Sequence, residues 1–469
     1  MTSAQQFFIG NNLPTAHNLS IISGGKTLSY AELLRAVLRA GRHLKDSGIC
    51  RDDRVGILSH NSVEYLIVLF ALWRVGAVAC LFSTRLPDNT LKKQLKSINC
   101  RRLLTSTDLV AITEPSQNTE AADEQNFCVP LGQEATIIFT SGSSSTPKAV
   151  LHTFGNHYYN AKGSNEHIPV IPGDQWLLSL PLYHVGGLGI IIRTFLGGGS
   201  LVIPDHHQRI DETLARHKIT HLSLVPTQLI RLLQNAGIHS ALRNLKVILL
   251  GGSAIPDSLI SDAIKLGLPV YTTYGSTEMA SQVATSKRLS EENQISSGEI
   301  LNYRQLMISE TGEILAKGET LFKGYIETAR LSLPFNKNGY FATGDIGEFS
   351  DDGRLVVRGR KDNMFISGGE NIQPEEIEAI LSRVESIDQA IVIPVKDKEF
   401  GFQPVAIIKS REGHFIKIPE ILEFLLNYLP KFKIPKAFLD WPDQIKSDTS
   451  KINRLELSQA ILLAHPNYS

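Results

Sequence analysis

The sequence has few of the residues that mark disulfide-rich, zinc-binding or secreted proteins. Only four of its 469 residues are cysteine, none of them in a CxxC pair, and its 14 histidines include no HExxH pair. This pattern predicts reduced, buried thiols in a cytoplasmic protein and gives no sign of a structural metal. The N-terminal residues also lack the basic and apolar regions of a secretory signal. The cysteines are Cys50, Cys80, Cys100 and Cys128.

An excess of charge of one sign is absent as well. The formal net charge is +0, so no overall field draws the protein to nucleic acid or to an anionic membrane. The most apolar stretch, residues 65–83, is interrupted by Arg74 and Gly76. We therefore expect a buried helix followed by a buried strand there, and no membrane insertion.

What the sequence does have is an alternation of strand and helix patterns. Hydrophobic residues make up 42% of the chain and charged residues 20%, which is typical of a globular protein long enough for two or more domains. Helical spacing covers residues 27–45, with Thr27 or Ser29 as the cap, and residues 62–75. Because such helices separate strand-like runs, we expect βαβ units and parallel sheets. The runs are residues 54–58, 201–204 and 247–250.

The pattern changes after about residue 310. Short strand-like runs with glycine turns, such as residues 312–315 and 353–357, lead to a polar segment, residues 359–363, that suits a linker. The chain beyond it predicts a small α+β domain. Its elements are a helix at 375–384, a strand at 390–395 and a helix at 419–428 that begins with proline.

Residues 140–148 form the most informative segment of the chain. They follow a strand-like run, residues 134–139, and contain four consecutive hydroxyl side chains, a glycine and Lys148. Backbone N–H groups and hydroxyls can donate hydrogen bonds to a polyphosphate, and Lys148 adds a mobile positive charge. The glycine spacing is not that of a Walker A loop. A solvated serine-rich linker is the alternative interpretation.

Seven separated segments together resemble one family. In their order and spacing they are similar to the core motifs of the acyl-adenylate-forming, or AMP-binding, superfamily, which includes acyl-CoA ligases, peptide-synthetase adenylation domains and beetle luciferases. The resemblance covers nearly the whole chain. The segments are residues 140–148, 181–187, 274–278, 343–345, 359–362, 367–372 and 451–454.

This resemblance implies an α/β fold in two domains. The N-terminal domain, residues 1–360, would contain packed βαβ-built sheets and a small β-barrel-like part. Residues 361–362 would be a hinge, and residues 363–469 a small mobile α+β domain that carries the catalytic lysine. The active site would lie between the two domains.

The resemblance also implies a two-step reaction. A carboxylate attacks the α-phosphate of ATP to give acyl-AMP and pyrophosphate, and the thiol of coenzyme A then displaces AMP. The expected ligands are ATP, Mg²⁺, coenzyme A and a small carboxylic acid. Two anions approach each other in the first step, which requires pooled positive charge.

The same resemblance assigns roles in nucleotide binding. Lys148 and the serine-rich loop would hold the β- and γ-phosphates, with Thr140 in a catalytic position, and Glu278 would hold Mg²⁺. Tyr274 would stack on adenine, and Asp345 would accept both ribose hydroxyls. The remaining nucleotide residues are Ser141, Gly142, Ser143, Ser144, Gly251, Gly252, Ser253, Gly275, Ser276, Thr277 and Arg360.

Four further residues are assigned to catalysis and domain motion. Lys451 would neutralise the α-phosphate and the carboxylate in the first transition state. Asp362 would absorb the change in backbone dihedrals between the two steps. Gly369 would face the coenzyme A tunnel, and His184 would be the gate between that tunnel and the acyl pocket. A surface lysine and a buried, hydrogen-bonded histidine are the alternatives for Lys451 and His184.

Within the superfamily, the chain looks most like the o-succinylbenzoate–CoA ligases of menaquinone synthesis. The resemblance lies in residues 224–229, 274–281, 367–376 and 394–401. Such a substrate has a succinyl carboxylate to be activated and a benzoate carboxylate that needs a cationic partner. Arg193 is the candidate, because it interrupts an apolar run and would be costly to bury unpaired. Ser223 and Thr227 are further pocket candidates.

Other interpretations stay open. Arg193 could pair with a protein carboxylate or extend to the surface, in which case an aryl- or fatty-acyl-CoA ligase is the alternative function. An adenylation domain that loads a carrier protein and a nucleotide-binding homologue without catalysis are two more. The last is motivated by Ser145, Ala149 and Ser450, which stand where many family members have glycine. A homo-oligomer is compatible with the sequence.

Overall fold

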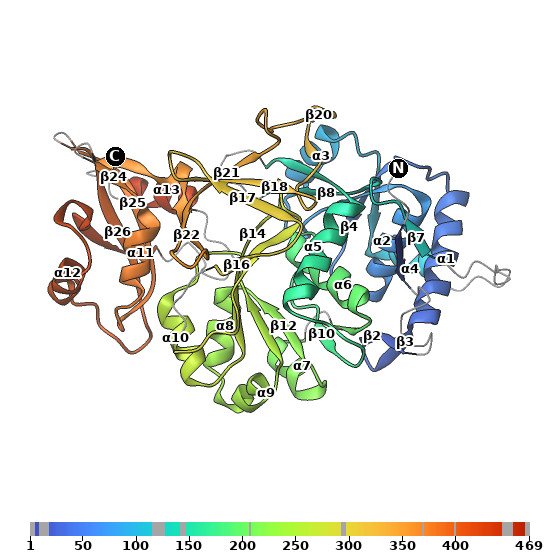
Figure 1. Ribbon diagram of the computed structural model, residues 1–469, viewed down its shortest axis with the longest axis horizontal. Coiled ribbons are helices and arrows are strands. Elements are labelled where there is room, and N and C mark those ends of the chain that lie inside the picture. The colour runs from blue at the N-terminus through green and yellow to red at the C-terminus, as the bar shows by residue number, and fades with distance from the viewer. Residues whose placement is uncertain are drawn as a thin grey trace.

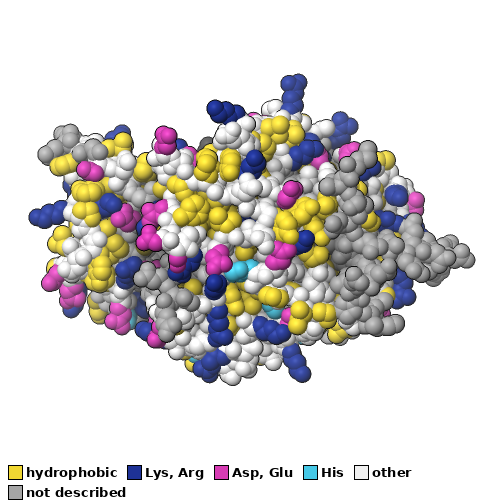
Figure 2. Space-filling model, in the orientation of Figure 1, with side chains coloured by type: hydrophobic (Ala, Val, Ile, Leu, Met, Phe, Trp, Pro, Cys, Tyr) yellow, Lys and Arg dark blue, Asp and Glu magenta, His cyan; other side chains and the backbone are white. Residues whose placement is uncertain are grey.

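We describe a computed structural model of the chain, which covers residues 5–8, 18–114, 127–140, 147–205, 208–291, 297–367, 370–397, 400–442 and 454–464. The N-terminal sheets and helices lie at one end of the longest axis and the small C-terminal part lies at the other (Figure 1). Lys and Arg side chains are scattered among Asp and Glu over the face seen in Figure 2. Among the described helices, none combines the length and hydropathy that a membrane crossing requires.

The first large sheet has seven strands in the order β20-β19-β9-β8-β5-β4-β6. Its central pairs β5–β8, β4–β5 and β4–β6 are parallel, whereas β9 is antiparallel to both β8 and β19. The strands are β4 (Arg54–Leu58), β5 (Val78–Leu81), β6 (Arg102–Thr105), β8 (Glu134–Phe139), β9 (Ala149–Thr153), β19 (Gly324–Glu327) and β20 (Arg330–Ser332). The helices of this region are α1 (Tyr30–Asp46), α2 (Val63–Val75), α3 (Asp88–Ser97) and α4 (Ser106–Thr113).

The second large sheet has nine strands in the order β16-β15-β14-β13-β12-β10-β11-β2-β3. The strands are β2 (Leu19–Ser23), β3 (Lys26–Ser29), β10 (Gln175–Leu177), β11 (Ser200–Ile203), β12 (His221–Leu224), β13 (Val247–Leu250), β14 (Val270–Ser276), β15 (Ser281–Thr285) and β16 (Glu299–Ile300). Its helices are α5 (Phe154–His167), α6 (Val185–Gly197), α7 (Ile210–Arg216), α8 (Pro226–Leu233), α9 (His239–Arg243) and α10 (Asp257–Lys265), with a 3₁₀ turn η1 (Ala236–Ile238). The run of parallel pairs from β2 to β14 confirms the expected parallel sheet.

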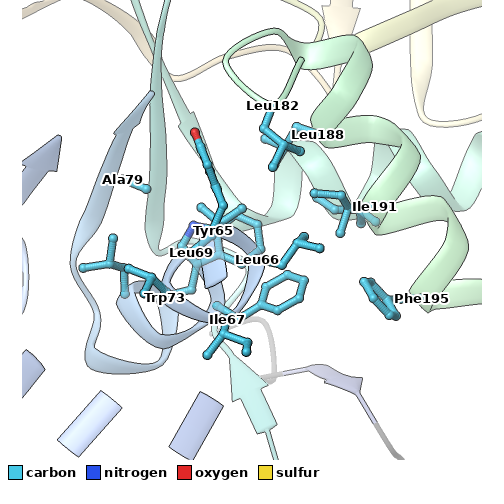
Figure 3. Packing of buried hydrophobic residues seen from close by; sticks show 14 of the residues in the cluster. Tyr65, Leu66, Ile67, Leu69, Trp73, Ala79, Leu182, Leu188, Ile191 and Phe195 are labelled. Atoms are coloured by element: carbon cyan, nitrogen blue, oxygen red, sulfur yellow. The ribbon is translucent and has the colours of Figure 1, made fainter. Parts of the chain in front are cut away.

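Helix α2 is buried over most of its length, because it lies between the first sheet and helix α6. Its residues from Tyr65 to Trp73 belong to one hydrophobic cluster with Leu188, Ile191 and Phe195 of α6 (Figure 3), and the Phe70 ring packs 5.7 Å from that of Phe195. The Trp73 indole Nε1 donates a 2.9 Å hydrogen bond to the Ala135 carbonyl. The expectation of a buried helix followed by a buried strand in residues 65–83 is therefore confirmed.

A four-stranded antiparallel sheet follows, in the order β17-β18-β21-β22. It supplies the barrel-like part that the resemblance implied, and its strands are β17 (Arg304–Ile308), β18 (Glu313–Gly318), β21 (Phe341–Phe349) and β22 (Leu355–Arg360). The C-terminal part has hydrophobic clusters of its own. Its elements are η2 (Lys361–Asn363), β23 (Phe365–Ser367), β24 (Glu370–Ile372), α11 (Pro374–Leu381), β25 (Ile387–Asp397), β26 (Gly401–Ser410), α12 (Ile418–Leu426), η3 (Lys431–Lys433), β27 (Ala437–Asp440) and α13 (Arg454–Ala464). At the other end of the chain, β1 (Gln5–Phe8) pairs with β7 (Phe127–Val129).

Three details refine or correct the sequence expectations. Of the two candidate caps of the first helix, Ser29 is the one that caps α1: its backbone N–H and hydroxyl both donate to the Glu32 carboxylate at 2.7 Å. Thr27 belongs to β3, so the helix begins at Tyr30 and not at residue 27. The segment 359–363, which the sequence analysis considered a linker, has local structure: its first two residues end β22 and the rest form η2. Among the four thiols Cys80 and Cys100 are buried, but Cys50 is exposed, since it lies in the turn after α1.

Candidate active site

The base of the serine-rich loop is closed by hydrogen bonds between its two ends. Thr140 follows β8 and Lys148 precedes β9; the Thr140 N–H donates to the Lys148 carbonyl at 2.9 Å, and the Lys148 N–H donates to the Thr140 hydroxyl at 3.3 Å. Two paired antiparallel strands thus hold Lys148 at the mouth of the loop. The predicted phosphate contacts Ser141, Gly142, Ser143 and Ser144, and also Ser145, lie outside the described residues.

Lys148 and Glu278 both contact Tyr325, a residue that the sequence analysis did not assign to the site. The Tyr325 hydroxyl donates a 2.9 Å hydrogen bond to Glu278 Oε1, and Lys148 Nζ lies 5.0 Å from the centre of the Tyr325 ring. Burial, followed by the charge of Glu278, raises the pKa of Tyr325, so its hydroxyl stays protonated and remains a donor. A carboxylate is a suitable ligand for Mg²⁺, and in the described part of the chain this one has no cationic partner.

The predicted adenosine contacts gather where β14, β21 and β22 meet. The Tyr274 hydroxyl donates to Asp345 Oδ2 at 2.6 Å, and Arg360 Nη1 donates to Asp345 Oδ1 at 3.0 Å. Burial and the Asp345 charge hold the pKa of Tyr274 well above its usual range. A Cβ on Gly344, which has a φ of +73°, would lie 2.8 Å from Arg360 Nη2, so glycine leaves room for the guanidinium.

The glycine pair after β13 brings two strands close together. A Cβ at Gly251 would lie 2.6 Å from the Thr273 methyl carbon of β14, and Gly252 has a φ of +88°. Gly252 and Ser253 are exposed at the end of the sheet. Exposed backbone at this edge is available to a flat ligand beside Tyr274.

The turn of residues 274–278 is anchored from behind by a buried histidine. His152 of β9 is fully buried, and its Nε2 lies 2.7 Å from the Thr277 carbonyl oxygen. Its ring packs 4.8 Å from that of His157, which lies 2.8 Å from the Thr136 hydroxyl. Desolvation lowers the pKa of His152 to about 4, so at neutral pH it is an uncharged donor to the turn that carries Glu278.

Gly275 allows the backbone of this turn to lie close to the backbone of β15. A Cβ at Gly275 would lie 2.1 Å from the Ser281 carbonyl oxygen, so only glycine fits this register of β14 and β15. Ser276 accepts a 3.2 Å hydrogen bond from the Met279 N–H through its hydroxyl. These contacts fix the path of the backbone between Tyr274 and Glu278.

Arg193 is the most unusual group in the predicted acyl pocket. Its side chain is 1% exposed on helix α6, and no carboxylate of the described residues pairs with it. Nη2 donates to the Ser281 hydroxyl at 3.1 Å, the guanidinium lies 5.8 Å from the Trp176 ring centre, and Nε has no hydrogen-bond partner in the part of the chain that the structure describes. Burial lowers the pKa of Arg193 to about 9, so the group is still charged at neutral pH.

Ser281 reaches Arg193 from a backbone conformation that is rare for a residue with a side chain. Ala280 has a φ of +56° and Ser281 a φ of +127°. The buried Asn160 holds this turn on both sides, because its amide donates to the Met279 and Gln282 carbonyls, both at 2.9 Å. No pattern in the sequence predicts the positive φ of Ala280 or Ser281, because this backbone strain arises only from the fold.

The other predicted pocket residues lie in different settings. Ser223 of β12 is buried and accepts a 3.2 Å hydrogen bond from the Trp176 indole, so Trp176 links it to Arg193. Thr227 is half-buried in α8, and no described contact joins it to Arg193. His184 precedes α6 and is exposed, with its ring 4.8 Å from that of Tyr183, which argues against a buried structural histidine.

The structure describes the predicted hinge residue, Asp362, but not the predicted catalytic lysine. Asp362 lies in η2, and its carboxylate accepts a 3.3 Å hydrogen bond from Arg360 Nη2. Lys451, Ser450 and Gly369 lie outside the described residues. Their roles, like those of the other site residues, stay predictions.

Comparisons with known proteins bear on this geometry. The family model described as AMP-binding enzyme matches residues 13–326. Two curated relatives are both 2-succinylbenzoate–CoA ligases. That of Geobacillus sp. (strain WCH70) is 31% identical over 98% of each chain, and that of Haemophilus influenzae is 36% identical over 92% of this chain and 93% of the relative.

Solved structures of the o-succinylbenzoate CoA synthetase of Bacillus subtilis have the same fold. The complex with the acyl-adenylate intermediate OSB-AMP has a TM-score of 0.84 at 29% identity, over 94% of this chain and 96% of that one. The complex with ATP and a magnesium ion has a TM-score of 0.83 at 28% identity, over 95% and 97%. A double mutant bound with the product analogue OSB-NCoA has a TM-score of 0.70 at 28% identity, over 97% and 99%.

The buried histidine predicts a specific pH dependence of stability. Because the pKa of His152 falls from 6.5 to about 4 on folding, the unfolded chain binds the extra proton between these values. The contribution of His152 to the free energy of unfolding is therefore fully present above pH 6.5. About 3 kcal/mol of it is lost as the pH falls to about 4. His152→Gln keeps a donor for Thr277 but cannot titrate.

We expect urea denaturation to show a smaller loss of stability between about pH 7.5 and about pH 4.5 in His152→Gln than in the wild type. His414→Gln is the matched control, because His414 is exposed. If all three proteins lose stability equally over this range, His152 is not held neutral by the fold.

Proposed function

We propose that this chain, which belongs to the AMP-binding enzyme family and within it to the 2-succinylbenzoate–CoA ligases, activates the succinyl carboxylate of 2-succinylbenzoate. It is an acid–thiol ligase of the adenylate-forming type. In the first step ATP and the acid give acyl-AMP and pyrophosphate. In the second step the acyl group passes to the thiol of coenzyme A, giving 2-succinylbenzoyl-CoA and AMP.

The buried guanidinium of Arg193 carries the choice of acid. A charge at 1% exposure without a carboxylate is strongly disfavoured, unless a ligand supplies the counter-ion. The benzoate carboxylate of the substrate, which does not react, has the required charge and a planar shape that suits a guanidinium fork. A simple fatty acid would leave Arg193 unpaired.

The charges of the nucleotide region suit the first step. Lys148 and the serine-rich loop would hold the β- and γ-phosphates, and Glu278 is the residue that would hold Mg²⁺. The metal, when bound, neutralises phosphate charge and orients the polyphosphate. Asp345 is already hydrogen-bonded to Tyr274 and Arg360 at 2.6 and 3.0 Å. Its carboxylate is therefore held in a fixed orientation, in which it would accept hydrogen bonds from the ribose hydroxyls.

The second step requires movement of residues 363–469 about Asp362, as the family resemblance implies. Lys451 acts in the first step and leaves for the second. Gly369 lines the path of coenzyme A, and the exposed His184 is the gate. A cytoplasmic location stays a prediction.

The proposed function has a direct test. We expect incubation with ATP, Mg²⁺, coenzyme A and 2-succinylbenzoate to yield the CoA thioester, AMP and pyrophosphate, detected by mass spectrometry. A panel of aryl and fatty acids in a pyrophosphate-release assay separates the alternative acyl-CoA ligases. A pantetheinylated carrier protein in place of coenzyme A tests whether the chain is instead an adenylation domain that loads a carrier protein. Failure of every acid to release pyrophosphate, with ATP bound, would leave only a non-catalytic nucleotide-binding protein.

The role of Arg193 is tested by a variant and a truncated substrate. We expect Arg193→Ala to weaken transition-state binding of 2-succinylbenzoate by roughly 2–5 kcal/mol, since it breaks a buried charge pair. The substrate analogue without the benzoate carboxylate lacks that pair, so its kcat/KM should change much less. Equal losses with both acids would remove Arg193 from substrate recognition.

The two half-reactions separate the role of Lys451. We expect Lys451→Ala to slow adenylation by roughly 10²–10³-fold, as for the loss of one preorganised positive charge. Thioester formation from preformed acyl-AMP should be almost unchanged, because that step takes place after Lys451 has left. Comparable damage to both half-reactions would argue against alternation of the domains.

A further inference from the structure

We propose that Tyr325 is a positioning residue that keeps Lys148 and Glu278 apart and correctly oriented for a magnesium-bound polyphosphate. This inference rests on the proposed function, because it assumes that these two residues serve the nucleotide. It concerns a residue that the sequence motifs did not assign to the site.

Tyr325 is held rigidly between the two charged residues. It lies in β19, is 5% exposed, and its ring packs against Phe322 and Phe341 with centroid distances of 4.8 and 6.3 Å. Its backbone pairs with Val150 of β9, two residues after Lys148. The ring therefore has a fixed place relative to the strand that follows the serine-rich loop.

Glu278 is tied to the same region through its backbone and its side chain. The Phe322 N–H donates to the Glu278 carbonyl at 2.7 Å, and the Tyr325 hydroxyl donates to Glu278 Oε1 at 2.9 Å. Oε2 has no hydrogen-bond partner among the described residues. The hydroxyl thus orients the carboxylate without using both of its oxygens, and it leaves a ligand atom for the metal.

The tyrosine also prevents the two opposite charges from neutralising each other. Lys148 Nζ contacts the ring face at 5.0 Å, and in the described part of the chain no ion pair joins Lys148 to Glu278. A direct pair would withdraw both groups from the nucleotide. A neutral ring attracts the ammonium weakly, so Lys148 can exchange the ring for a phosphate.

Two substitutions separate the two contacts of Tyr325. Tyr325→Phe keeps the ring below Lys148 and removes the hydrogen bond to Glu278. We expect it to weaken binding of Mg·ATP, measured by titration calorimetry, about 10-fold or more, as for partners of metal ligands in other sites. Binding of ATP in EDTA should not change. Mn²⁺ bound with ATP, followed by electron paramagnetic resonance, should show the same loss.

Tyr325→Leu removes the ring as well. Because Lys148 is then free to approach Glu278, we expect weaker binding of ATP in EDTA as well as of Mg·ATP. Tyr303→Phe is the matched control: its hydroxyl donates to Glu166 at 2.8 Å and Lys162 Nζ lies 5.0 Å from its ring, but it lies outside the proposed site. It should bind Mg·ATP as the wild type does.

The outcomes distinguish the inference from the function on which it rests. If Tyr325→Phe, folded by circular dichroism, binds Mg·ATP as tightly as Tyr303→Phe, the inference is wrong and the proposed function stands. If Tyr325→Phe weakens binding in EDTA as much as with Mg²⁺, the hydroxyl does not act through the metal and the inference is also wrong. If the wild type binds Mg·ATP but forms no acyl-AMP, the proposed function fails.

Discussion

The structure depends on charged side chains that the fold holds in place without neutralising them. Arg193 is buried with a serine hydroxyl and an aromatic ring as its neighbours, and no carboxylate of the described residues reaches it. Lys148 and Glu278 contact the same tyrosine and do not pair. Each of these groups would be more stable with a counter-ion, and among the described residues each lacks one where a ligand of the proposed reaction would supply it. Unused charge of this kind distinguishes a binding site from the ordinary ion pairs of a protein surface.

These charges are fixed by contacts between the two large sheets. His152 and Tyr325 belong to the first sheet, through β9 and β19, yet both hydrogen-bond to residues 277–278, which follow the last residue of β14 in the second sheet. Asn160 and Ser281 fix the other end of the same turn beside Arg193. The predicted acid pocket and the predicted nucleotide site therefore share one stretch of backbone. In the proposed reaction, such sharing would hold the acid and the nucleotide in a fixed relative position, which favours attack on the phosphate.

The fold was largely predictable because hydrophobic periodicity and capping act locally. Residues 54–58, 134–139 and 247–250 form strands with the expected bounds, and Ser29 and Ser62 cap helices α1 and α2. Tertiary contacts decided details that the local pattern did not show. Residues 359–360 continue β22 because Asp345 and Ile346 of β21 pair with them. The expectation of buried thiols was wrong for Cys50, which is exposed in the turn after α1.

By itself the sequence determined the order of strands and helices, the motifs of an AMP-binding enzyme and the oddity of an arginine in an apolar helix. Each of these is a property of residues that are close together in the chain. Only the tertiary structure decided which distant residues share one site. Trp176 and Ser281 surround Arg193, and Tyr325 separates Lys148 from Glu278, although long stretches of chain lie between them. Their contacts depend on strand register and on a strained turn at Ala280 and Ser281, and these arise only when the two sheets pack together.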